Sequence, residues 1–153
     1  MKKLLLSVAL VAASFGASAA SDSKSFDVRV KLLAVCKLST ISLVDFGDYT
    51  SMQTTGITST GGAFTATCTN SLPYSLKFIS DAGANTDGGT FPTTQLAYTL
   101  GLSASTGLIG NGAAQSYNVT GAMAGNQIGT CASPVASACD ETRTGAHTVF
   151  VVY

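Results

Sequence analysis

The chain of 153 residues is long enough for one domain with a modest hydrophobic core, and too short for two domains with separate cores. Charged residues make up 10% of the sequence and the formal net charge is zero, so clustered lysines and arginines are not available to bind phosphates. The composition therefore excludes a nucleic-acid partner, and no residue pattern in the chain implies a cofactor.

The first twenty residues have the pattern of an export signal. Two lysines precede an apolar run from Leu4 to Phe15, and the small residues Ala17-Ser18-Ala19 follow it. The run of about 12 residues is shorter than the roughly 20 that a membrane-spanning helix needs. Cleavage after Ala19 or Ala20 leaves six basic and eight acidic residues. We therefore expect residues 1–20 to be a signal peptide and the mature chain to act outside the inner membrane.

The segment directly after the signal alternates with a period of two, which predicts an amphipathic β-strand. Apolar side chains occupy one face and charged side chains occupy the other. The apolar positions are Phe26, Val28, Val30, Leu32 and Ala34, and the charged positions are Asp27, Arg29 and Lys31.

Six further segments predict strands because they are apolar or alternating and are bounded by turn residues. The glycine-rich stretches Asp81 to Gly89 and Gly110 to Gly112 read as loops. No helical stripe occurs after the signal, so an all-β, immunoglobulin-like sandwich is expected over residues 36–153. The predicted strands are Ile41 to Phe46, Gly62 to Thr69, Tyr74 to Ile79, Leu96 to Leu102, Gln115 to Ala122 and His147 to Tyr153.

Four cysteines remain after signal cleavage, an even number that favours disulfides in an exported protein. Three pairings are possible. Cys131 and Cys139 lie eight residues apart across a turn, so a local bridge is easy to close, and Cys36 then pairs with Cys68. A zinc site is the competing reading, but the chain has one histidine and no C-x-x-C spacing.

Few residues are candidates for chemistry. Asp45 and Asp48 flank Phe46-Gly47, where a tight turn is a better explanation than an acid–base pair. His147 is the only imidazole, no nucleophile or ligand set accompanies it in the sequence, and we place it at the start of the last strand. The loop from Asp81 to Gly89 lacks the alternating acidic spacing of a calcium site. We therefore expect no catalytic residue and no metal, and we regard the chain as a non-enzyme.

Several short motifs occur in an order and spacing that resemble the spore coat protein U domain, the subunit domain of archaic chaperone–usher pili. The resemblance covers nearly the whole mature chain. It departs from the family near the C-terminus, where Gly145-Ala146-His147-Thr148 replaces a common Gly-x-Tyr-x-Asp turn, and in the extra pair Cys131 and Cys139. The motifs are the alternating Phe26 to Cys36, Asp45-Phe46-Gly47-Asp48-Tyr49, Phe64 to Asn70, Pro73-Tyr74-Ser75-Leu76, Leu96 to Leu100 and Val119-Thr120-Gly121.

The resemblance implies a sandwich that lacks its last strand and is completed by donor-strand exchange. Residues 21–35 would be the donor segment, whose residues Phe26, Val28, Val30 and Leu32 fill a groove in the next subunit. By parity, Val149, Val151 and Tyr153 would form the edge of the acceptor groove. The implied partners are copies of the chain or related pilins, a periplasmic chaperone and an outer-membrane usher. The implied location is a surface pilus that serves adhesion and biofilm formation.

Two alternatives follow from the residues alone. The segment from Phe26 to Ala34 could be the first strand of the chain's own sandwich. The protein could then be a secreted carbohydrate- or surface-binding sandwich, acting as a monomer or as a tip adhesin, with a periplasmic hydrolase a more distant reading. Solution behaviour separates them, because a donor-strand subunit polymerises or needs a chaperone, whereas a binding module is a stable monomer.

Overall fold

The computed structural model describes residues 21–78, 85–131 and 139–153, and within these ranges it contains strands and turns but no helix. The predicted signal peptide therefore lies outside the described residues. No helix in the described ranges has the length and hydropathy to span a membrane. The strands are β1 Cys36–Leu38, β2 Val44–Asp45, β3 Ile57–Thr58, β4 Thr60–Gly61, β5 Ala63–Cys68, β6 Pro73–Phe78, β7 Thr86–Thr90, β8 Ala97–Leu102, β9 Leu108–Ile109, β10 Ala114–Met123 and β11 Val149–Val152.

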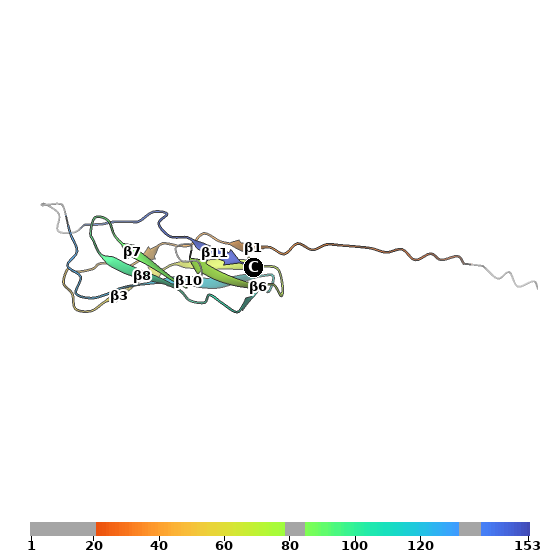
Figure 1. Cartoon of the computed structure of the whole chain (residues 1–153), viewed down its shortest axis with the longest axis horizontal. Helices are drawn as coiled ribbons and strands as arrows, with labels where there is room; N and C mark the ends of the chain where they lie inside the picture. The colour runs from red at the N-terminus through yellow and green to blue at the C-terminus, as the bar shows by residue number, and fades with distance from the viewer. Residues whose placement is uncertain (1–20, 79–84, 132–138) are drawn as a thin grey trace, which may run out of the picture. The chain divides into compact units, whose positions relative to one another are not determined.

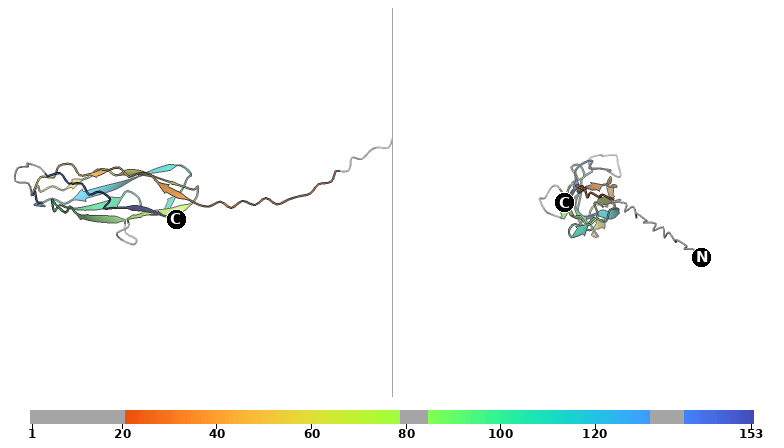
Figure 2. Two further views of the ribbon diagram at one scale, coloured as in Figure 1. Left: turned by 90° about the horizontal axis from the view of Figure 1, so that it is seen from above. Right: turned by 90° about the vertical axis from the view of Figure 1, so that its right-hand side faces the viewer.

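The strands form an antiparallel β-sandwich of two main sheets (Figures 1 and 2). The larger sheet has the order β1-β5-β10-β8-β7, and β3 also pairs with β10. The smaller sheet has the order β11-β6-β9, and β2 and β4 form a separate short ladder. The predicted all-β fold class is confirmed.

The core forms because the long strands bury alternate residues, as a strand with one face against a partner sheet must. Tyr74 on β6 and Tyr117 on β10 join the two sheets through their hydroxyls, 2.6 Å apart. Burial, followed by this hydrogen bond, raises the pKa of Tyr74. The buried hydrophobic residues are Cys36, Phe64, Ala66, Cys68, Tyr74, Leu76, Phe78, Tyr98, Leu100, Tyr117, Val119, Met123 and Val149.

The structure confirms the long predicted strands as β5, β6, β8, β10 and a shorter β11. Of the predicted strand from Ile41 to Phe46, only Val44–Asp45 pairs. The interpretation of Asp81 to Gly89 as a loop is wrong for its second half, because Thr86–Thr90 forms β7 against β8. A Cβ added to Gly88 would lie 2.6 Å from the Tyr98 carbonyl oxygen, so glycine here permits close pairing between strands. Residues 81–84 of that stretch lie outside the described ranges.

Both predicted disulfides are present, Cys36–Cys68 and Cys131–Cys139, and together they account for all four cysteines. Cys36 and Cys68 are directly opposed in the register of β1 and β5, so this bridge fixes the strand that follows the N-terminal segment. The tight turn at Asp45 is also confirmed, because the Gly47 N–H donates to the Asp45 carboxylate at 2.8 Å and Gly47 has a φ of +64°.

Candidate functional site

The C-terminal strand β11 is an edge strand. It pairs antiparallel with β6, with Val149 opposite Phe78 and Val151 opposite Leu76. Among the described residues no strand pairs with its other side. That side therefore presents backbone N–H and C=O groups that a further strand could pair with.

Within β11 the side chains alternate between the core and the solvent. Val149 is buried and Val151 is half-buried, and both pack against the core. Phe150, Val152 and Tyr153 remain exposed, at 42%, 49% and 56%. Of the three residues predicted for the groove edge, Val149 and Val151 thus contribute inward-facing side chains, and Tyr153 follows the strand as an exposed residue.

The four predicted donor residues lie in a segment to which the structure assigns no strand. Their side chains are apolar and almost fully exposed, at 84% for Phe26, 83% for Val28, 89% for Val30 and 79% for Leu32. The residues belong to a structural unit of their own, separate from the sandwich that begins at Leu33. Four large apolar side chains exposed at alternating positions mark a segment suited to pairing with another chain.

The sandwich is fixed at the point where this segment joins it. The Thr69 N–H donates to the Val35 carbonyl at 2.9 Å, and the Val35 N–H donates to the Thr69 hydroxyl at 3.0 Å. The Cys36–Cys68 bridge follows immediately. Hydrogen bonding to the residue after β5 therefore begins at Val35, one residue before β1.

The residues that lead into β11 are held by polar contacts instead. The Glu141 carboxylate accepts the Thr94 N–H at 2.8 Å and the Thr93 N–H at 3.0 Å, and it also accepts the Thr94 hydroxyl at 3.0 Å. Desolvation acts to raise the pKa of Glu141, but these hydrogen bonds outweigh it and hold the pKa below its usual value. The ionised carboxylate therefore fastens this lead-in to the turn before β8.

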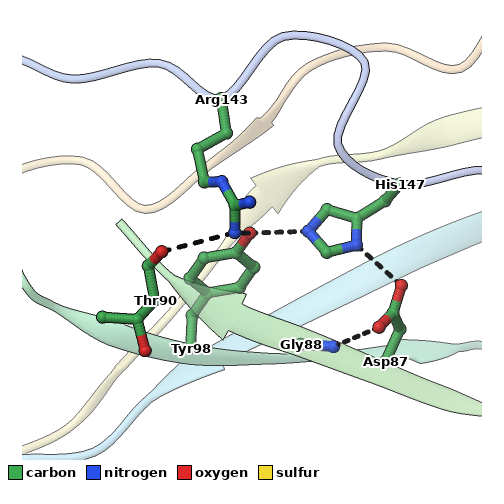
Figure 3. Close-up of polar contacts among 6 residues, drawn as sticks. All are labelled: Asp87, Gly88, Thr90, Tyr98, Arg143 and His147. Atoms are coloured by element: carbon green, nitrogen blue, oxygen red, sulfur yellow. Dashed lines mark hydrogen bonds and ion pairs between the residues drawn. The ribbon is translucent and has the colours of Figure 1, made fainter. Parts of the chain in front are cut away.

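A second polar group lies two residues before β11 (Figure 3). His147 Nδ1 is 2.6 Å from Asp87 Oδ2, and its Nε2 is 2.5 Å from the Tyr98 hydroxyl. Arg143 Nη1 donates to the same hydroxyl at 3.1 Å and to the Thr90 carbonyl at 3.3 Å. The sequence placed His147 near the start of the last strand, which is correct to within two residues, but it indicated none of these partners.

The arrangement of Asp87, His147 and Tyr98 resembles a catalytic triad in its connectivity, yet it lacks the features of one. Tyr98 is 6% exposed and packs between Phe46 and Phe91, at ring-centroid distances of 5.7 and 4.9 Å. Its oxygen is already contacted by both Arg143 and His147, and its shielded position gives it little access to a substrate. The described residues also contain no cluster of metal-ligating side chains.

Comparison with known proteins gives one result. The family model of the Spore Coat Protein U domain matches residues 22–149. No curated protein and no solved structure matches the chain. The match includes the exposed apolar segment and the sandwich as far as the first residue of β11.

Proposed function

Because the chain belongs to the Spore Coat Protein U domain family, we propose that it is a structural subunit of an archaic chaperone–usher pilus that polymerises by donor-strand complementation. The family is of the structural pilin type, and it is associated with chaperone–usher assembly and a surface location. In this proposal residues 1–20 are the export signal, residues 21–35 the donor segment and residues 36–153 the pilin domain. The assembled fibre would serve adhesion and biofilm formation.

One observation carries the proposal: the chain combines an edge strand without a partner on one side with an exposed segment that has strand periodicity. Strand β11 supplies the open edge within the described residues. Phe26 to Leu32 supplies alternating apolar side chains. A strand added beside β11 would pair with the open backbone groups of β11 through the groups on its own facing side.

The energetics favour such an addition. Burying each of Phe26, Val28, Val30 and Leu32 contributes about 1.5–3 kcal/mol, or roughly 6–12 kcal/mol for the four. Ordering the segment and losing the freedom of a separate subunit oppose this gain. The charged side chains Asp27, Arg29 and Lys31 would point to the opposite face and remain in water.

A donor and an acceptor that are different segments of one chain favour a fibre. The donor segment and β11 are different surfaces of the chain, so their contact is heterologous and leaves a free donor and a free acceptor at each step. Before assembly the open edge of β11 would invite aggregation. This need implies two partners. A periplasmic chaperone would cover the edge of β11, and an outer-membrane usher would replace the chaperone with the next subunit.

The test compares two substitutions on opposite faces of the donor segment. Val30→Asp places a carboxylate in the apolar groove, at a cost of several kcal/mol, and should abolish polymers while the sandwich stays folded. Arg29→Asp changes the solvent face and should assemble nearly as the unchanged chain does. Size-exclusion chromatography and electron microscopy of exported protein report the result.

Fibres of normal length from the Val30→Asp chain would contradict the proposal. A monodisperse, stable monomer from the unchanged chain would also contradict it. The second outcome would favour the secreted carbohydrate- or surface-binding module.

A further inference from the structure

Four polar side chains form a continuous row between β7, β8 and the residues before β11 (Figure 3). The row runs from Arg143 through the Tyr98 hydroxyl to His147 and ends at Asp87, with contacts of 3.1, 2.5 and 2.6 Å. Asp87 lies on β7 and Tyr98 on β8, both in the larger sheet, whereas His147 precedes a strand of the smaller sheet. The row therefore connects the two sheets.

The chemistry of the groups constrains the direction of the hydrogen bonds in the row. An arginine can only donate, so the Tyr98 oxygen accepts from Arg143. In a neutral ring, the single hydroxyl hydrogen of Tyr98 is then directed to an unprotonated His147 Nε2, whereas a protonated ring would donate from Nε2 to the second lone pair of the Tyr98 oxygen. Nδ1 carries the ring hydrogen and donates it to Asp87 Oδ2.

Asp87 and Gly89 complete the geometry. The other carboxylate oxygen of Asp87 accepts the Gly88 N–H at 2.7 Å, which fixes the orientation of the acceptor. A Cβ added to Gly89 would lie 2.5 Å from Arg143 Nη1 and 3.2 Å from the Tyr98 hydroxyl. Glycine at this position therefore lets the guanidinium reach across β7 to Tyr98.

Three of the four side chains in the row are shielded, whereas Arg143 is exposed. Tyr98 is 6% exposed, and the side chains of Asp87 and His147 are 9% and 21% exposed. The His147 ring also packs edge-on against Tyr98, with ring centroids 5.6 Å apart. Hydrogen bonds in such surroundings are costly to break, because the groups left behind have little access to water.

We infer that this row positions β11 as a preformed acceptor edge, so that the edge is in place before a donor strand arrives. The inference rests on the proposed function. β11 has four residues and is paired on one side only in the described chain, so without such an anchor it would open readily. If β11 is already ordered, binding of the donor strand does not have to supply the entropy cost of ordering it. The complex of the donor strand with β11 then dissociates more slowly.

The experiment uses the full exported chain with Val30→Asp, which removes the chain's own donor and leaves β11 unchanged. The synthetic peptide Ser25 to Val35 serves as the donor. Hydrogen exchange of the Val149–Val152 amides reports the acceptor edge, and the dissociation rate of the peptide reports binding. Three variants each interrupt the row: Tyr98→Phe, Gly89→Ala and His147→Asn.

Each variant should accelerate exchange at β11 and peptide dissociation by about tenfold, the factor expected for one lost buried hydrogen bond. Amides of β5 and β10 should change little. Thr144→Ala, at an exposed residue in the same lead-in, is the control and should leave both rates unchanged. Gly89→Ala matters most, because it displaces Arg143 without altering any side chain in the row.

A spectroscopic measurement separates the directed row from ordinary packing. The nitrogen chemical shifts of the His147 ring should show the hydrogen on Nδ1, and Tyr98→Phe should shift the Nε2 resonance, because this nitrogen loses its hydrogen-bond partner. A ring with its hydrogen on Nε2 would overturn the inferred direction.

The outcomes distinguish the two proposals. If the peptide fails to bind the Val30→Asp chain at all, the proposed function fails. If it binds but none of the three variants changes β11 exchange or dissociation, the positioning role is wrong and the proposed function stands.

Discussion

The two ends of the chain are both apolar and both suited to strand formation, but the structure treats them differently. Phe26 to Leu32 has strict alternation, and its apolar side chains are exposed with no strand assigned. β11 is nearly continuous in hydrophobic residues and is paired with β6 on one side. The first segment has the side-chain pattern of a strand but pairs with no sheet in the described chain. The second segment is a strand of the sheet with one edge that is not paired.

The ends also differ in what fixes the residues next to them. A covalent bridge between Cys36 and Cys68 fixes the sandwich just after the donor segment. The lead-in to β11 is fixed by the side chains of Glu141, Arg143 and His147. The chain thus combines a covalent anchor at one end with a hydrogen-bonded one at the other. The difference predicts how each end responds to mutation, reduction and acid.

The largest effect is expected from removing part of β11. Deleting Val151 to Tyr153 takes away the half-buried Val151 and two of the four positions of β11 that pair with β6, and with them half of the open edge. The subunit should lose its fold, since the core near Leu76 would be uncovered. The exported protein should be degraded and absent from the cell surface, which immunoblotting of periplasmic and surface fractions measures. Normal surface levels of the truncated chain would show that β11 is dispensable.

The next effect compares the two disulfides. In the chain-entropy model the Cys36–Cys68 bridge, with a separation of 32 residues, contributes about 3–4 kcal/mol. The Cys131–Cys139 bridge, with a separation of 8, contributes about 2.5 kcal/mol. Replacing the first pair by serine should lower the denaturation midpoint of the Val30→Asp chain more than replacing the second. The reverse order would indicate that the anchor at the donor end is not the stronger one.

The smallest effect concerns Glu141 and pH. Its hydrogen bonds lower the pKa in the folded state, so the carboxylate contributes stability above its usual pKa of 4.5, and the contribution is lost as the pH falls through the lowered value. Glu141→Gln should therefore reduce the melting temperature at pH 7, and the difference from the unchanged chain should shrink by pH 3. Asp140→Asn, at the exposed neighbouring residue, is the matched control. A difference that is the same at both pH values would show that the charge of Glu141 does not matter.

The long strands could be predicted from the sequence because each alternates for six residues or more. Ala63–Cys68 and Ala114–Met123 bury every second side chain, and periodicity alone identifies them. Strand β7 could not be predicted, because Thr-Asp-Gly-Gly-Thr has the composition of a turn and forms a strand through its pairing with β8. The strands of two residues carry too little pattern to recognise.

Sequence reasoning reached only the part of the candidate site that depends on the pattern within one segment. The parity of Val149 and Val151 follows from period-two geometry within one segment. The contacts of His147 join residues 49 and 60 positions apart in the chain, and nothing local in the sequence marks Tyr98 or Asp87 as its partners. The sequence did contain one signal for these contacts. His147 is the only histidine and lies next to the edge strand β11, and a histidine that is shielded from water needs polar partners.

The central claim is that the N-terminal segment of one copy pairs with β11 of the next. The most direct test measures hydrogen exchange across the full Val30→Asp chain, with and without a large excess of the peptide Ser25 to Val35. The account predicts that the Val149–Val152 amides become strongly protected, that the melting temperature rises with peptide concentration, and that the same peptide carrying Val30→Asp does neither. Unchanged exchange at β11 under saturating peptide, with the chain already a stable monomer, would contradict it.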